Sequence, residues 1–387
     1  MPWKVSDVMS ERMDLVLRLK RGESMAEVCR DLGISRKTGY KFWQRYEVEG
    51  AGGLEDASRA PKRVALKTPL EVEQLLVETR RAHPSWGGRK IKALLERAGT
   101  RLPSAGTIAA VLKRHGLVQK RRRRLRPAAY AGALSPGQAP NDVWAVDYKG
   151  QFRLGNGQYC YPLTSSDLCS RYLLAAEALE GTDEAAARQT FEEIFREHGL
   201  PTVIRSDNGT PFASQGLAGL TKLSAWWLRL GIKHQRTRPA HPQDNGCHER
   251  MHRTLKAETT RPARHNSLQQ QERFDEFRRF FNEERPHEAL GMKCPSEVYR
   301  ASERRMPTKL PEVTYPLHDD ILVVGRGGHI RLPLGRQVFL SYALVGQPVG
   351  LREEDGGGWL VTFMDLDLGH YHPGTGAFEP TIPPQAT

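Results

Sequence analysis

Three carboxylates in the sequence could act together on phosphate. Asp147 interrupts the apolar run 143–148, which predicts a buried strand, and Asp207 follows a second predicted strand at 203–205. A carboxylate is seldom kept in a buried strand unless it is paired or binds a metal. Together with Glu249, the aspartates supply the oxygen ligands that Mg²⁺ prefers, and two Mg²⁺ ions about 3.5–4 Å apart catalyse in-line displacement at phosphate. The three side chains indicate phosphodiester cleavage or transfer.

A helix predicted after residue 246 carries Glu249 beside two cations. Glu249, Arg253 and Lys256 share one helical face, whereas Met251 and Leu255 share the opposite face. We expect the apolar face to pack inward and Glu249 to face a cleft, with Arg253 and Lys256 available to substrate phosphates. Taken alone, Glu249 is equally well explained as a solvated residue paired with Arg253.

The positive charge is concentrated in the first third of the chain. The net charge of the 387 residues is +13. Residues 1–134 contain 29 Lys and Arg against 14 Asp and Glu, while the other 253 residues contain 29 against 31. A concentrated basic surface favours polyanions because neutralising phosphates releases counterions. The asymmetry therefore favours a nucleic-acid partner over a merely soluble charged surface.

Residues 11–50 predict three short helices in a helix-turn-helix pattern. A capping box at Ser24–Glu27 opens the second helix, a tight turn spans 32–35, and the third helix covers 36–46. Three-helix bundles also bind proteins, but the local basic charge favours DNA. The residues that the third helix would offer to a major groove are Ser35, Arg36, Lys37, Tyr40 and Lys41.

A second helical unit follows a linker at 50–67. A capping box opens its first helix, with Pro69 at the first helical position. Further helices are expected near 88–97 and 104–115. A basic run then precedes a Pro/Ala/Gly-rich linker that ends at residue 140. Such a run is ordinarily a solvated arm, but beside two predicted DNA-binding units we interpret it as one that follows phosphates. Its members include Arg121, Arg122, Arg123 and Arg124.

From residue 141 the pattern changes to alternating strands and helices, which is typical of an α/β domain. Strands are expected at 143–152, 159–167, 172–179 and 203–205, and helices at 183–198 and 217–230. Residues 311–387 predict short strands and turns, typical of a small β-barrel or sandwich. That last region carries 9 acidic against 4 basic residues, which favours a protein-contact or positioning role.

Several short strings in the core recur together in the order of a known family. They are Trp144-Ala145-Val146-Asp147, Ser206-Asp207-Asn208-Gly209, His241-Pro242-Gln243, Asn245-Gly246, Glu249-Arg250, Leu255-Lys256, Asn282, Arg285-Pro286-His287, Leu290-Gly291 and Pro295. As a set, they resemble insertion-sequence transposases with an integrase core, members of the retroviral integrase and ribonuclease-H-like superfamily with an Asp, Asp, Glu triad. The resemblance covers about 141–300, and Lys256 fills the basic position that the family has after its glutamate.

The resemblance implies a multidomain α/β protein. It would have a ribonuclease-H-like mixed-sheet core at 141–303, preceded by helix-turn-helix domains at 1–55 and 65–120 and a linker at 120–140, and followed by a small β-barrel at 311–387. It also implies a DDE transposase, a polynucleotidyl transferase that binds terminal inverted repeats, cleaves at element ends and joins 3′-hydroxyl ends to target DNA.

The same resemblance implies catalytic and metal-binding roles for the three carboxylates. Asp147 would bridge two Mg²⁺ ions, and Asp207 and Glu249 would each complete one, with Mn²⁺ able to substitute. The implied partners are element and target DNA and a second copy of the chain, at least a dimer on DNA. A bacterial, cytoplasmic and nucleoid-associated protein is expected. An N-terminus without a signal-peptide pattern and an absence of long apolar runs agree with this and predict no membrane partner.

One departure concerns the spacing of the triad. The 41 residues between Asp207 and Glu249 are more than is common in the family. A longer surface helix at 217–230 would absorb the excess without moving the triad. Asp244 is the competing carboxylate, but it lies before the helix and lacks the spacing to Lys256.

The sequence also contains features of two other functions. His248 and His252 flank Glu249 in the His-Glu-x-x-His pattern of zinc metalloproteases, but there is no third histidine, since Glu258 stands where it would fall. The five cysteines form no Cys-x-x-Cys pair and are expected to be reduced and structural. A DNA-binding regulator with an inactive nuclease-like core is the other alternative, and three intact carboxylates argue against it.

The charge distribution predicts where duplex DNA binds. Fragment 1–134 should bind duplex DNA with an affinity that falls steeply as salt rises, whereas fragment 135–387 should bind much more weakly. Fluorescence anisotropy on both fragments measures this. Equal affinities for the two fragments would contradict the assignment.

Overall fold

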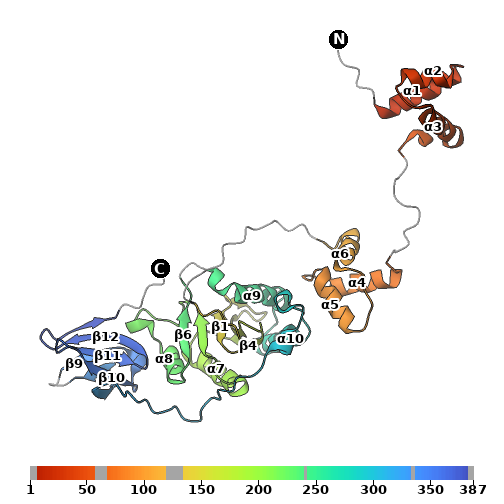
Figure 1. Cartoon of the computed structure of the whole chain (residues 1–387). Coiled ribbons are helices and arrows are strands. Elements are labelled where there is room, and N and C mark those ends of the chain that lie inside the picture. Colours follow the sequence, from red (N-terminus) through yellow and green to blue (C-terminus); the bar gives the residue numbers. More distant parts are fainter. Residues whose placement is uncertain (1–6, 57–67, 119–133, 239–241, 333–335, 382–387) are drawn as a thin grey trace. The chain divides into compact units, whose positions relative to one another are not determined.

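The computed structural model describes residues 7–56, 68–118, 134–238, 242–332 and 336–381. The chain divides into two compact units, Met1–Pro69 and Leu70–Thr387 (Figure 1). The predicted basic arm containing Arg121, Arg122, Arg123 and Arg124 lies outside the described residues.

The first unit is the predicted helical bundle. Its core contains Leu15, Val16, Val28 and Phe42. The Ser24 hydroxyl accepts a hydrogen bond from the Glu27 backbone N–H, and the hydroxyl of Ser35 caps the next helix in the same way. Each cap satisfies a backbone N–H at the start of a helix that has no partner within the helix. The elements are α1 (Val8–Lys20), α2 (Met25–Asp31), α3 (Arg36–Glu49) and the 3₁₀ turn η1 (Gly50–Leu54).

The second unit begins with three further helices. They are α4 (Leu70–Ala82), α5 (Gly88–Arg97) and α6 (Ala105–Arg114), packed around Leu76, Trp86 and Ile108. This helical set contacts the α/β region that follows it. His83 stacks on Phe280 with ring centroids 5.2 Å apart, and Arg97 forms a 2.6 Å ion pair with Glu297.

A mixed sheet forms the centre of the second unit. Its strands run in the order β2-β3-β1-β5-β6, with β4 paired to β3. β1 pairs with β3 antiparallel and with β5 parallel, and β6 continues the parallel side. The strands are β1 (Val143–Tyr148), β2 (Phe152–Arg153), β3 (Tyr159–Asp167), β4 (Leu173–Leu179), β5 (Val203–Ser206) and β6 (Lys233–Arg236). The single strand predicted at 143–152 is therefore two strands, separated by residues 149–151.

Helices cover both faces of this sheet. On one face, Trp144 and Val146 of β1 pack in a cluster with Phe191 of α7 and Trp227 of α8. On the other face, α9 and α10 pack against β4 through a cluster that includes Met251 and Phe274 (Figure 1). The helices are α7 (Glu184–His198), α8 (Lys222–Arg229), α9 (Gly246–Thr259), α10 (Ser267–Glu283) and α11 (Pro295–Val298), with 3₁₀ turns η2 (Leu217–Gly219), η3 (Pro242–Asn245) and η4 (Glu288–Leu290).

The expectation of a surface helix at 217–230 was wrong. The segment is divided into η2 and α8, and Trp226 and Trp227 are buried against the mixed sheet. On its other side, Leu220 and Ala225 belong to the apolar cluster of the C-terminal sheet. The extra residues therefore lie between two sheets, because both faces of the helix carry apolar side chains.

The C-terminal region has an open sheet. Its order is β13-β12-β11-β10-β7, all antiparallel, with β8 and β9 as a separate pair. Among the described residues no pairing joins β7 to β13, so the predicted closed β-barrel is not confirmed. The strands are β7 (Asp320–Val323), β8 (His329–Arg331), β9 (Gln337–Phe339), β10 (Pro348–Glu353), β11 (Trp359–Phe363), β12 (Leu366–His372) and β13 (Ala377–Pro380), with the 3₁₀ turn η6 (Tyr342–Leu344).

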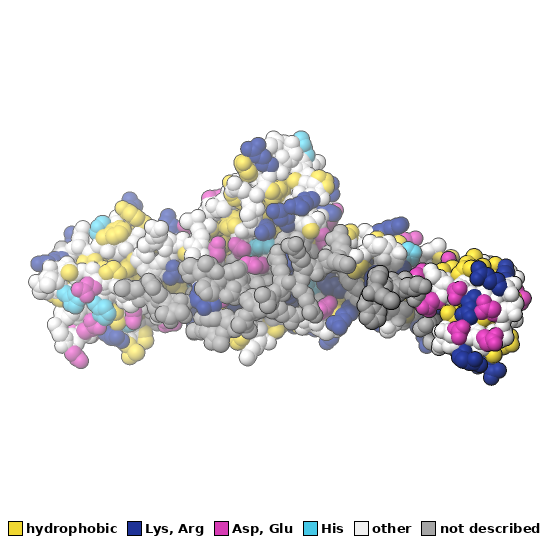
Figure 2. Space-filling model, turned by 90° about the horizontal axis from the view of Figure 1, so that it is seen from above, with side chains coloured by type: hydrophobic (Ala, Val, Ile, Leu, Met, Phe, Trp, Pro, Cys, Tyr) yellow, Lys and Arg dark blue, Asp and Glu magenta, His cyan; other side chains and the backbone are white. Residues whose placement is uncertain are grey.

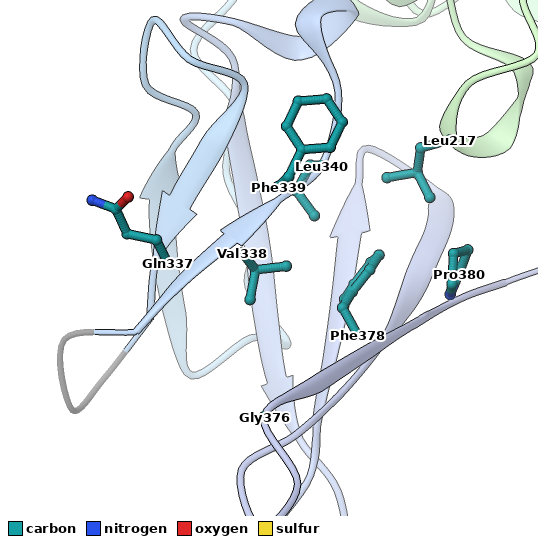
Figure 3. Close-up of a pocket in the computed structure, with 8 residues that line it drawn as sticks. All are labelled: Leu217, Gln337, Val338, Phe339, Leu340, Gly376, Phe378 and Pro380. Atoms are coloured by element: carbon teal, nitrogen blue, oxygen red, sulfur yellow. The ribbon is translucent and has the colours of Figure 1, made fainter.

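A largely apolar pocket of about 450 Å³ lies in this C-terminal region. Figure 3 shows Val338 and Phe378 on either side of it, with Leu217 of η2 at its edge. Its lining contains none of the three carboxylates. Within the described ranges, no helix combines the length and the apolar character needed to cross a membrane.

Candidate active site

Two of the three carboxylates stand at the same level of neighbouring strands. β1 and β5 run parallel with Val143 opposite Val203, so Asp147 and Asp207 each lie four residues beyond a paired position. Neighbouring strands are about 4.8 Å apart. Asp207 directly follows the last residue of β5, is exposed, and its Oδ1 accepts a 3.1 Å hydrogen bond from the Gly209 N–H. The parallel pairing thus brings both aspartates to one edge of the sheet.

The third carboxylate reaches this region from α9. Met251 and Leu255 are buried against α10, as the helical periodicity predicted, and Glu249 is exposed on another face. Asp147 and Glu249 both line a pocket of about 450 Å³. The other residues of this carboxylate pocket are Lys149, His252, Arg253, Lys256, Ala257 and Arg261. The two cations predicted to share the face of Glu249 therefore share its pocket.

Electrostatics single out Asp147. Burial, together with the negative charges of Asp207 and Glu249 and against the opposing charge of Lys149, raises the pKa of its carboxyl to about 7. Each of the two other carboxylates thus lies near enough to repel a charge on Asp147. A divalent cation bound between them would remove this repulsion, so the donor chemistry fits Mg²⁺.

The carboxylates are near one another but do not form a closed metal cage. Across the described part of the chain, no three His, Cys, Asp or Glu side chains converge closely enough to hold a metal ion. Asp207 is also missing from the lining of the carboxylate pocket, although its charge affects Asp147. The fit to Mg²⁺ therefore rests on the kind of ligand and on the mutual repulsion.

The histidines on either side of Glu249 are bonded to β3. His248 and His252 are 1% and 2% exposed, and the Nε2 atoms of both rings contact the hydroxyl of Thr164 on β3, at 2.8 and 2.6 Å. Burial lowers the pKa of both imidazoles, so both rings are neutral. The zinc-protease alternative requires two histidines and an open metal position on one accessible face, and this arrangement contradicts it.

Asp244, the competing carboxylate, has a structural partner. Its side chain is fully buried and forms an ion pair with Arg238, with 2.9 Å between Asp244 Oδ1 and Arg238 Nη2. A second oxygen, Oδ2, accepts a 3.1 Å hydrogen bond from Nε of the same guanidinium. Such a two-point pairing occupies both oxygens, so Asp244 braces the segment before α9.

The predicted DNA-contacting residues of the first unit lie along one end of α3. Arg36, Lys37, Tyr40 and Lys41 are exposed, and Ser35 is exposed as the N-cap. On the face seen in Figure 2, Lys and Arg side chains are scattered among acidic, polar and apolar groups. The assignment of these side chains to DNA stays a prediction.

Sequence reasoning missed several residues of the site. Lys149 and Arg261 line the carboxylate pocket, and Thr164 joins β3 to α9 by hydrogen bonds. The sequence does contain a pattern that could have predicted the hydrogen bonds between β3 and α9. Thr164 and Ser166 alternate along one face of a strand, and two histidines stand four residues apart on a helix.

One family string has a structural explanation. Asn282 of α10 accepts a 2.8 Å hydrogen bond from the Leu173 N–H through Oδ1 and donates a 2.9 Å bond to the Leu173 carbonyl through Nδ2. The side chain thus satisfies both backbone groups at the start of β4, which fixes α10 to the sheet.

Comparison with known families agrees with this architecture. Two descriptions of the Integrase core domain match residues 137–242 and 230–295. A Helix-turn-helix domain matches residues 11–62, and a Homeodomain-like domain matches residues 38–112. The mixed sheet lies within the residues that the Integrase core domain matches.

Relatives come from insertion elements and retroviruses. The chain is 26% identical over 283 residues to the Insertion element IS476 uncharacterized 39.2 kDa protein of Xanthomonas euvesicatoria, covering 72% of this chain and 78% of that protein. It is 28% identical over 253 residues to the Gag-Pol polyprotein of Baboon endogenous virus, covering 63% of this chain. The chain spans only 14% of that polyprotein's length.

Among solved structures, the HTLV-2 integrase catalytic core domain in complex with magnesium is similar, at 16% identity and with a TM-score of 0.34. The match covers 42% of this chain and 99% of that chain. The matched domains and the insertion-element relative carry the assignment, together with the order of strands in the mixed sheet. The chain therefore carries an integrase core domain at residues 137–295 and is similar to proteins of insertion elements.

Proposed function

We propose that this chain is a DNA transposase that cleaves at the ends of its insertion element and joins the freed 3′-hydroxyl ends to target DNA. The observation that carries the proposal is that Asp147 and Asp207 lie at the same end of neighbouring parallel strands while Glu249 shares a pocket with Asp147, and that burial and the charges of Asp207 and Glu249 raise the pKa of Asp147. A half-buried carboxylate that two others repel, beside cations, suits phosphoryl transfer, because the reaction needs both metal ligands and groups that neutralise phosphate.

Asp147, Asp207 and Glu249 would hold Mg²⁺ in this proposal, with Mn²⁺ able to substitute. Bound Mg²⁺ supplies charge neutralisation at the phosphate and activation of the attacking oxygen. The attacking oxygen belongs to water in the first step and to the 3′-hydroxyl of the element end in the second. In each step one phosphorus–oxygen bond forms and another breaks, so the number of phosphodiester bonds is conserved when the ends are joined.

The pocket's cations would place the DNA. Lys149, Arg253 and Lys256 line it beside the carboxylates, and their charge suits phosphate oxygens rather than a metal. The helical units at 1–55 and 65–120 would bind the terminal repeats, with the linker at 120–140 between them and the core at 141–303. The sheet at 311–387, with its acidic excess, would serve a positioning role rather than general DNA binding.

Two substitutions on α9 separate DNA placement from metal binding. Lys256→Ala should reduce end processing and joining by about 10-fold or more, while Mn²⁺ affinity stays near wild type, because Lys256 contacts phosphate only. Glu249→Gln should abolish joining and also weaken Mn²⁺ binding, because it removes a ligand charge. Strand-transfer assays on short end substrates and calorimetry with Mn²⁺ measure the two effects. A fully active Lys256→Ala protein would show that this side chain is only a solvated helix residue.

The raised pKa of Asp147 predicts a pH dependence in two measurements. Between its ordinary pKa of 3.8 and about 7, the folded metal-free protein binds a proton that the unfolded chain releases. The stability contributed by this proton is present at low pH and is lost as pH rises towards 7. Mn²⁺ must displace the same proton, so Mn²⁺ affinity should rise up to about pH 7 and then level off.

Asp147→Asn removes the titrating group and is the variant to compare. Without divalent cations, urea unfolding should show that this variant gains stability relative to wild type between pH 5 and pH 8. Exposed Glu272 provides a matched control through Glu272→Gln, which should follow the wild-type profile. Identical pH profiles for Asp147→Asn and wild type would refute the assigned shift. Wild-type strand transfer by Asp147→Asn in Mg²⁺ would refute the triad itself.

Joining two element ends requires two active sites held together, so we expect at least a dimer on DNA. Light scattering of the full chain with paired end-containing duplexes should give a mass of two or more copies. A protein that stays strictly monomeric on paired ends while it completes joining would contradict this expectation.

A further inference from the structure

The hydroxyl of Thr164 lies where β1, β3 and α9 meet. Thr164 is opposite Asp147 in the antiparallel register, and its Oγ1 donates a 3.1 Å hydrogen bond to the Asp147 backbone carbonyl. The same oxygen contacts Nε2 of His248 at 2.8 Å and Nε2 of His252 at 2.6 Å. A hydroxyl offers one donor and two acceptor positions. With these three partners, the hydroxyl of Thr164 is fully used.

This saturation determines which nitrogen of each ring carries the proton. The single hydroxyl proton goes to the Asp147 carbonyl, so both Nε2 atoms must donate to Thr164 Oγ1. Nδ1 of His248 is then an acceptor, and the Ser166 hydroxyl lies 2.6 Å from it in the position to donate. Each of these four contacts thus has one donor and one acceptor.

The network is expensive to bury, which argues for a purpose beyond packing. Thr164, Ser166 and both histidines are at most 5% exposed. Buried polar groups contribute little net stability when paired and destabilise strongly when a partner is lost. Met251 and Leu255 already attach α9 to the core through apolar contacts. Hydrogen bonds add what those contacts lack, namely direction and a defined distance.

The two elements that the network joins are the ones that carry Asp147 and Glu249. Glu249 stands on α9 between the two histidines in sequence, and Nδ1 of His252 lies 3.5 Å from Asp147 Oδ2. We propose that Thr164, His248 and His252 form a positioning unit that fixes α9 against β1 and thereby sets the separation and orientation of Asp147 and Glu249. This inference rests on the proposed function, because it takes these carboxylates as the metal ligands.

The test compares Thr164→Val, which has nearly the same shape but no hydroxyl, with Thr164→Ser, which keeps the hydroxyl. Thr164→Val in the full chain should lower Mn²⁺ affinity and strand transfer about 10- to 100-fold, as loss of groups that orient metal ligands does. Thr164→Ser should restore both to near wild type. Thr190→Val is the matched control, because Thr190 is a buried threonine of α7 whose hydroxyl bonds only to the Ala186 carbonyl of its own helix in the described contacts.

A spectroscopic measurement tests the network without activity. Nitrogen-15 spectra of the metal-free protein should show both His248 and His252 as the Nε2–H tautomer, and Thr164→Val should disturb both rings. An Nδ1–H tautomer at either ring would overturn the inference. So would a folded Thr164→Val protein that binds Mn²⁺ as wild type does.

Two further variants keep the outcome interpretable. If Thr164→Val fails to fold, Ser166→Ala removes the next hydroxyl and should weaken Mn²⁺ binding in the same direction, and wild-type binding by this variant would overturn the inference. Asp147→Asn reports on the proposed function alone. An active Asp147→Asn protein refutes the triad, whereas an inactive one beside a fully active Thr164→Val protein refutes only the positioning unit.

Discussion

The parallel pairing of β1 with β5 is the constraint on which the candidate site depends. Side chains alternate along a strand, so a shift of one residue in this pairing would turn one aspartate to the opposite face. The register places Asp147 and Asp207 at equal distances beyond a shared pair, although 59 residues separate them in sequence. The connection that permits a parallel neighbour is α7, which packs Phe191 and Phe195 on the sheet face that carries Trp144.

The opposite face of the mixed sheet meets α9, and two kinds of contact hold the helix there. Met251 and Leu255 supply apolar burial, which is strong but tolerates small shifts. The hydrogen bonds around Thr164 are few but directional. Glu249 projects from the same helix into the carboxylate pocket, so the chemistry of the site depends on a helix whose inner side is partly polar. Repulsion at Asp147 then makes the site receptive to a cation.

Local periodicity was enough to predict most elements and the faces of α9. The apolar run around Asp147, the caps at Ser24 and Ser35, and the opposite faces of Glu249 and Leu255 all follow from short-range rules that the structure obeys. Predictions failed where distant segments decide. α8 was expected on the surface because nothing nearby in sequence reveals that a second sheet covers Leu220 and Ala225. Closure of a barrel likewise depends on pairing between strands far apart in sequence.

The position of α8 between two sheets has a consequence for how the chain comes apart. Trp227 belongs to the core of the mixed sheet, and two residues earlier Ala225 belongs to the core of the C-terminal sheet. If the C-terminal sheet opens locally, α8 loses the apolar contacts on one of its sides, and its packing on the mixed sheet is weakened as well. Local opening of the C-terminal sheet is therefore coupled to loosening of the segment that links Asp207 to Glu249. The C-terminal sheet thereby restrains the segment between two of the candidate carboxylates, even though its strands lie outside the carboxylate pocket.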